Sequence, residues 1–131
     1  MKHAALVVVT VLVAAAASVR SPMPEARGGP AMKTTYLVLY RPGPHWVAGK
    51  PIRQQPPKEH GRYMLDLHAR GVMKLAGPFE DNTGAAITIE AADEAEAKSI
   101  VAADPAVKDG IFAAEIHPWA LVPWETYLKK K

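Results

Sequence analysis

The chain has 131 residues, a formal net charge of +3 at pH 7 and no cysteine. Its length is typical of one domain, and the lack of cysteine excludes a disulfide framework and a thiolate zinc site. Four of its positive charges are Lys2 and the C-terminal run 129–131, and without them the charge falls from +3 to −1. The sequence therefore offers no basic face for nucleic acid, and we predict no nucleic-acid partner.

The N-terminus has the three parts of a secretory signal peptide. Lys2 and His3 precede the apolar run AALVVVTVLVAAAA, which ends in small residues at Ala17. The run is shorter than the roughly 20 residues that a membrane span needs, so we expect no stable span. We predict a signal peptide at 1–17, a flexible lead-in at 18–31 and a periplasmic or secreted protein. The alternative is translation from Met32, which would leave the protein in the cytoplasm.

The folded domain is predicted over residues 32–119, followed by an unassigned C-terminal tail at 120–131. It begins with TYLVLY (35–40), an aromatic and β-branched run that predicts a buried strand. The next segment, 41–57, is rich in proline and too long for a simple connector. Long ordered loops in small domains are often functional, whereas disorder is the alternative.

The stretch PPKEHGRYMLDLHARG (56–71) predicts the first helix. Proline is tolerated at the first turn of a helix, and Gly71 supplies a stop. His60 begins an apolar stripe at helical spacing, which continues through Tyr63, Met64 and Leu67. His60 therefore lies near the start of a helix that packs on the core.

The remaining segments complete an alternating pattern. Strands are predicted at 72–78, 85–91 and 111–117, and a second helix lies between the last two. Asp93 caps this helix with Glu96 in a capping box, and Asp104-Pro105 ends it. Its apolar side is predicted to comprise Ala95, Ile100 and Val101.

The order β-α-β-β-α-β predicts an α+β, ferredoxin-like fold: a four-stranded antiparallel sheet with two helices on one face. The other face of such a sheet is bare in a monomer. Because Leu37 and Leu39 alternate with Tyr36, Val38 and Tyr40, both faces of the first strand are apolar. We therefore expect a homodimer, in which the sheets could pack face to face.

The histidines do not form a metal-binding pattern. His60 and His68 differ by about 80° around the helix and by about 12 Å along it, so they cannot share a metal there. A serine-nucleophile motif and a phosphate-binding loop are also missing from the sequence. We predict no metal and no cofactor. His68, near the helix end, is interpreted as structural.

His60 and Asp104 remain as a candidate acid/base pair, because a histidine with a carboxylate partner can move protons near neutral pH. The residues alone leave two questions open. His60 could instead be an ordinary helix-end histidine that packs on Tyr63 and Met64. The topology also allows the two residues to lie apart, to meet within one chain or to meet across a dimer.

Several segments together resemble the YCII-related domain family over about residues 32–119: HGRYMLDLHARG before a strand ending in LAGP, then DEAEAKSIVAADPAVKDGIF, then EIHPW. The resemblance implies a dimeric α/β barrel, similar to muconolactone isomerases and stress-responsive dimeric barrels. It also implies a site built from His60 and Asp104. Family members with assigned chemistry look like lyases that eliminate from oxidised aromatic rings. The leader, the loop 41–57 and the tail after Trp119 depart from the family pattern, so no substrate is carried over.

Three functions remain in competition. The first is a cofactor-free lyase or isomerase of a small cyclic or aromatic metabolite, in which His60 moves a proton and Asp104 orients it. Tyr36, Tyr40 and Trp46 are candidate substrate-binding walls, although the two tyrosines could belong to the core or an interface. The second function is a non-catalytic, ligand-binding or stress-related periplasmic module. The third is a protein-interaction domain that uses the loop and the tail.

Overall fold

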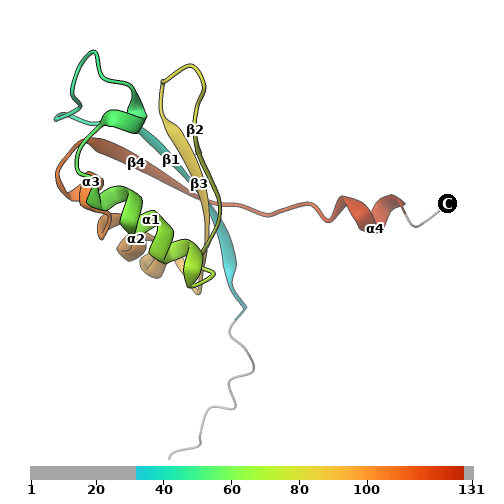
Figure 1. Ribbon diagram of the computed structural model, residues 1–131. Helices are drawn as coiled ribbons and strands as arrows, with labels where there is room; N and C mark the ends of the chain where they lie inside the picture. The colour runs from blue at the N-terminus through green and yellow to red at the C-terminus, as the bar shows by residue number, and fades with distance from the viewer. Residues whose placement is uncertain (1–31, 129–131) are drawn as a thin grey trace, which may run out of the picture.

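The computed structural model describes residues 32–128 (Figure 1). The predicted signal peptide and the whole predicted lead-in, which together span residues 1–31, lie outside the described residues, as do the last three lysines. The predicted leader and the predicted localisation are therefore untested. Within residues 32–128, no helix is long and apolar enough to cross a membrane.

The predicted order of strands and helices is confirmed. The strands and the two longer helices are β1 (Thr34–Pro42), α1 (Glu59–Ala69), β2 (Met73–Pro78), β3 (Ala85–Ala91), α2 (Glu94–Ala102) and β4 (Phe112–Pro118). All strand pairs are antiparallel, and the sheet has the order β2-β3-β1-β4. The fold is thus α+β and ferredoxin-like, with the helices on one face of the sheet (Figure 1).

Three short helices were not predicted. They are η1 (Ile52–Gln54), α3 (Pro105–Lys108) and α4 (Trp124–Leu128). The first interrupts the long loop between β1 and α1, and the second begins directly after the predicted stop of α2. Both contribute to the site described below.

The core lies between the sheet and the helices, and the alternation along β1 sets it. Tyr36, Val38 and Tyr40 are buried beneath the helices, whereas Leu37 and Leu39 point to the opposite face and are partly buried. One detail of α2 was predicted wrongly. Ala95 is exposed, and the buried positions are Ala97 and Val101, one turn apart.

The predicted helix ends are formed as the sequence indicates. Gly71 after α1 has a φ of 70°, a left-handed conformation that glycine adopts without steric cost. Asp93 caps α2, because its Oδ1 accepts a hydrogen bond from the Glu96 N–H at 2.8 Å. In an ideal capping box the Glu96 side chain would accept from the N–H of the cap residue, Asp93. Here Glu96 Oε2 accepts instead from the N–H of the preceding residue, Ala92, at 2.6 Å.

The face of the sheet that carries no helix is less apolar than predicted. Leu37 and Leu39 lie on it, but Arg41, Glu115 and His117 do as well. Arg41 pairs with Glu115 at 3.3 Å, and His117 Nε2 lies 2.8 Å from the same carboxylate. This open face is therefore a leucine strip beside a small charged cluster.

Residues 120–128, the C-terminal arm, run away from the body of the domain and end in α4 (Figure 1). The arm is rich in large apolar side chains that are exposed, which are Leu121, Val122, Trp124, Tyr127 and Leu128. An exposed apolar set of this kind normally marks an interaction surface.

Candidate functional site

The long loop between β1 and α1, residues 43–58, is attached to the domain at its start. Gly43 N–H donates to Ile111 O at 2.8 Å, and His45 N–H donates to Gly110 O at 2.9 Å. These bonds continue the contact of β1 with β4 beyond the end of the sheet. The start of the loop is therefore an ordered extension of the sheet.

Two side chains fix the middle of the same loop. Gln55 accepts a hydrogen bond from Val47 N–H at 2.9 Å and donates to the carbonyl oxygens of Val47 and Lys50, both at 2.8 Å. Asn82, in the turn between β2 and β3, accepts from Ile52 N–H at 2.7 Å. The loop thus bridges from β1 to the β2–β3 turn and forms a wall.

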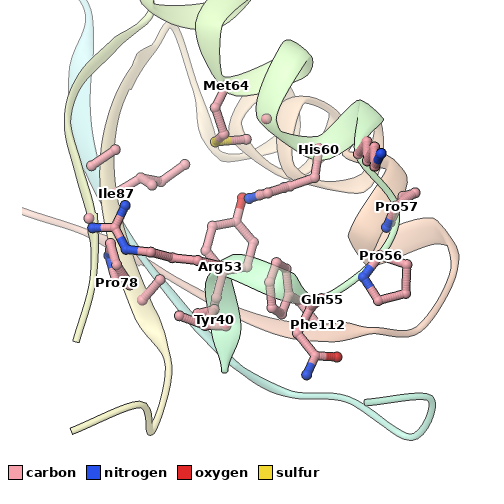
Figure 2. A pocket seen from close by; sticks show the side chains of 16 residues that line it. Tyr40, Arg53, Gln55, Pro56, Pro57, His60, Met64, Pro78, Ile87 and Phe112 are labelled. Atoms are coloured by element: carbon pink, nitrogen blue, oxygen red, sulfur yellow. The ribbon is translucent and has the colours of Figure 1, made fainter. Parts of the chain in front are cut away.

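Behind this wall lies a cleft of about 530 Å³, a size typical of sites for small ligands. Its lining comes from the loop, the first turns of α1, the strands β2 and β3, and the start of β4 (Figure 2). The apolar part of the lining includes Tyr40, Ile52, Met64, Ile87 and Phe112. A flat or cyclic apolar body is suited to these surfaces.

His60 and Asp104 meet at the cleft within one chain. His60 Nδ1 lies 2.9 Å from each carboxylate oxygen of Asp104. The His60 side chain is 27% exposed and lines the cleft, whereas the Asp104 side chain is fully buried. Because an ionised carboxylate only accepts hydrogen bonds, the proton of a neutral His60 belongs on Nδ1, which leaves Nε2 as the basic nitrogen.

The short helix α3 holds Asp104 in place. Asp104 is its N-cap, and Oδ1 accepts a hydrogen bond from Ala106 N–H at 2.9 Å. The same carboxylate therefore caps a helix and orients an imidazole. Two donors on a buried carboxylate compensate its loss of hydration, so Asp104 is fixed before any ligand arrives.

Neighbouring aromatic rings fix the position of His60. Its ring packs edge-on against Tyr40 and Phe112, with centroid distances of 6.0 and 5.1 Å. On the same helix, the Tyr63 hydroxyl donates to Ile100 O of α2 at 2.7 Å. This bond sets the spacing of α1 and α2, and α2 leads directly to Asp104.

Tyr40 presents an unusual hydroxyl group. Its oxygen is buried and makes no hydrogen bond of good geometry with residues 32–128, although the Asp104 carboxylate lies close enough to act on it. Burial, followed by the negative charge of Asp104, raises the pKa of Tyr40 far above its ordinary value. The phenol therefore stays protonated and can donate a hydrogen bond to a ligand. In Figure 2 the Tyr40 hydroxyl and the His60 ring point toward one another.

The other predicted binding residues lie elsewhere. Tyr36 is 4% exposed and belongs to the core beneath the helices. Trp46 packs against Phe112, with ring centroids 6.0 Å apart, but it is not part of the cleft lining. The structure thus brings Tyr40 to His60 and Asp104 and leaves Tyr36 and Trp46 outside, so their predicted role gains no support.

The sequence analysis missed most of the lining residues, among them Arg53, Lys58 and Phe112. Arg53 lies on η1 inside the proline-rich loop, which periodicity could not assign. The signal available in the sequence was the length of this loop together with its cationic residues.

Within the described part of the chain, no group of three potential metal ligands among His, Cys, Asp and Glu comes together. His68 lies near the C-terminal end of α1, where Nδ1 donates to Met73 O at 3.3 Å. It thus helps to join α1 to β2 and does not approach the cleft.

Comparisons with known proteins agree with the fold. A model of the YCII-related domain family matches residues 32–120. The uncharacterized protein YjpA of Bacillus subtilis (strain 168) is 40% identical over 87 residues, which are 66% of this chain and 95% of that protein. A solved structure of 5-chloro-2-hydroxyhydroquinone dehydrochlorinase from Burkholderia phenoliruptrix AC1100, in complex with 2,5-dihydroxybenzoquinone, is 21% identical with a TM-score of 0.39. The match covers 66% of this chain and 95% of that chain.

Proposed function

The chain belongs to the YCII-related domain family, and on that premise we propose that it is a cofactor-free lyase or isomerase of a small cyclic metabolite. One observation carries the proposal. A fully buried Asp104 holds Nδ1 of His60, and the partly exposed imidazole opens onto a cleft of small-molecule size. A base with a fixed tautomer beside an apolar cleft is the minimum that proton-transfer chemistry needs.

The proposed reaction begins with proton abstraction. Nε2 of His60 takes a proton from a C–H bond next to a carbonyl group of the substrate, and the electron pair of that bond moves toward the carbonyl oxygen. Asp104 stabilises the imidazolium that forms. In an isomerase His60 returns the proton to another atom. In a lyase the carbonyl re-forms, the returning pair makes a C=C bond, the leaving group on the neighbouring carbon departs with its bonding pair, and His60 gives its proton to that group or to water. Proton transfer by a positioned side chain accelerates a reaction about 10²–10⁴-fold.

Tyr40 supplies the complementary group. Its buried phenol is protonated and makes no hydrogen bond of good geometry within residues 32–128, so it can donate to the substrate oxygen on which negative charge develops. A donor that is already positioned pays no reorganisation when the charge appears, and such donors are typically worth about 10²–10³ in kcat. We therefore assign the predicted substrate contact of Tyr40 to its hydroxyl.

Deuterium incorporation tests the proposed proton abstraction without knowledge of the natural substrate. The full chain is incubated in D₂O with a panel of cyclic ketones, lactones and hydroxyquinones, and proton NMR follows the exchange of C–H positions. His60→Ala should abolish exchange with at least one compound that the wild type exchanges, while the melting temperature stays close to wild type. Unchanged exchange in His60→Ala would remove His60 from the reaction.

A ligand-binding module without turnover is the alternative use of the same cleft. It predicts that a compound of the panel raises the melting temperature, while neither exchange nor product appears on long incubation. The cleft geometry fits both functions, but the fixed Nδ1 tautomer favours the enzyme, because binding alone does not need a base.

We also propose that the chain forms a homodimer through the open face of its sheet. Leu37 and Leu39 on that face are only partly covered, and the C-terminal arm adds exposed Trp124 and Tyr127. A second copy would cover both sets of apolar side chains at once. The charged cluster around Glu115 would then lie at the rim of the interface, where polar residues are common.

A further inference from the structure

The cleft has a pronounced charge asymmetry. Of the 16 residues that line it, Arg53 and Lys58 are cationic and none is acidic. The carboxylate of Asp104, which holds His60, is fully buried and does not belong to the lining. A ligand in the cleft therefore meets positive charge at the rim and apolar surfaces inside.

Arg53 is the better placed of the two cations. Its side chain extends from η1 across the cleft toward Pro78 and Ile87 (Figure 2). The residues on either side of it are held in place, since Ile52 N–H bonds to Asn82 and the Gln55 side chain bonds back to the loop. Between residues 32 and 128, Arg53 takes part in no ion pair, although Arg41 and Arg70 do.

From this arrangement we infer that the cleft selects a small cyclic carboxylic acid, and that Arg53 is the residue that determines this specificity. The planar guanidinium matches a carboxylate with two parallel hydrogen bonds, which a point charge cannot reproduce. The ring of the acid would pack on Ile87, Met64 and Phe112. This inference rests on the proposed function only in taking the cleft as the substrate site.

The position of the carboxylate also fits the proposed chemistry. The side chain of Arg53 extends from η1 toward the strands β2 and β3, whereas His60 enters the cleft from α1. A ligand whose carboxylate lies at Arg53 thus presents its ring, and not its charge, to His60 and Tyr40. Arg53 would position the ring and leave the reacting atoms to the other two residues.

Calorimetric titration of the full chain with matched acid and amide pairs tests the inference. The probes are benzoate with benzamide and cyclohexanecarboxylate with its amide, and phenyl phosphate serves as a second anion. We expect at least one acid to bind about tenfold more tightly than its amide, as a charge-assisted bidentate pair implies. Arg53→Gln should abolish this preference, and Arg53→Lys should restore only part of it.

Arg62→Gln is the matched control, because Arg62 is exposed on α1 and does not line the cleft. It should keep the full preference for the acid. The inference is overturned if neither acid binds, if acid and amide bind equally, if Arg53→Gln retains the preference, or if phenyl phosphate binds more tightly than both acids.

The two proposals fail independently. His60→Ala should lose proton exchange but keep the preference for the acid, since that preference depends on Arg53. If His60→Ala retains exchange, the proposed function fails while the carboxylate assignment stands. If Arg53→Gln retains the preference, the carboxylate assignment fails while the acid/base function stands.

Discussion

His60 and Asp104 are 44 residues apart in sequence, and His60 Nδ1 nevertheless lies 2.9 Å from both carboxylate oxygens of Asp104 within one chain. The contact joins the first turn of α1 to the N-cap of α3. It therefore depends on how the two helices pack on the sheet, and it needs no second subunit. The predictions below separate its chemical role from its structural one.

Asp104 should contribute to stability as well as to chemistry. Asp104→Ala removes the cap of α3 and the partner of His60, so we expect the free energy of unfolding to fall by about 2–4 kcal/mol. Asp104→Asn keeps an oxygen that can cap α3 and should cost less, but it should still reduce proton exchange strongly because the His60 tautomer is no longer fixed. Urea denaturation and the exchange assay measure the two effects.

Asp93 is the matched control for this substitution, because it caps α2 but is exposed and lies away from the cleft. Asp93→Ala should cost about 1 kcal/mol and leave proton exchange unchanged. Equal losses of stability in the Asp93 and Asp104 variants would show that Asp104 is no more than a helix cap.

Tyr40→Phe should slow the reaction without loss of stability, whereas Tyr63→Phe should lower stability. Tyr40→Phe removes a buried hydroxyl that makes no hydrogen bond of good geometry within residues 32–128, so stability should stay level or rise, while kcat falls by about 10²–10³. Tyr63→Phe removes the bond to Ile100 and should cost about 0.5–1.5 kcal/mol of stability. Thermal unfolding and the proton-exchange rate together check both changes. A Tyr40→Phe variant with wild-type kinetics would limit Tyr40 to a packing role.

The raised pKa of Tyr40 should make stability sensitive to alkaline pH. Burial, and then the Asp104 charge, keep Tyr40 protonated in the folded state, whereas in the unfolded state it ionises near pH 10. Above that pH the unfolded chain binds fewer protons than the folded one, so unfolding becomes easier as the pH rises. Wild type should lose stability above about pH 10 more steeply than Tyr40→Phe. Parallel pH profiles of the two proteins in urea denaturation would contradict this.

The open face of the sheet should mediate the proposed dimer. Leu39→Glu places a charge on that face and should convert the protein to a monomer in analytical ultracentrifugation. Leu65→Glu is the control, because Leu65 is 67% exposed on the outer side of α1. Truncation after Trp119 removes the C-terminal arm and should weaken the dimer. A monomeric wild type would disprove the dimer itself.

The predicted signal peptide is tested by sequencing the N-terminus of the protein isolated from its host. Cleavage near Ala17 is expected, because small residues follow an apolar run of signal-peptide type. A protein that begins at Met32 would contradict export and favour translation from that methionine.

The sequence predicts the framework of the fold well, because its signals are local. Alternating apolar residues locate the strands, and Gly71 and Asp93 mark helix boundaries that the structure confirms. The loop between β1 and α1 was harder, since its order comes from single hydrogen bonds made by Gln55 and Asn82. Hydrophobic periodicity does not predict individual side-chain hydrogen bonds of this kind.

The candidate site was likewise predictable where the signal is local and unpredictable where it depends on tertiary contacts. His60 and Asp104 were selected from residue chemistry and family resemblance, but their meeting depends on α3, a four-residue helix too short to leave a periodic pattern. Tyr36 and Tyr40 look alike in sequence and share one face of β1. Only Tyr40 reaches the cleft, because it lies at the end of β1 next to the loop and His60.

Because Ile52 is bonded to Asn82, mutations in the β2–β3 turn could reshape the cleft in the course of evolution. The wall that carries Arg53 is tied to the β2–β3 turn, where Asn82 adopts a φ of 62° that few other residues accept. A change in that turn would shift the wall and the cation on it, while His60, Asp104 and Tyr40 stay where the core holds them. On the two proposals made above, ligand choice and proton chemistry would be encoded in separate parts of the chain, so a lineage could acquire a new substrate through a hairpin turn that does not line the cleft.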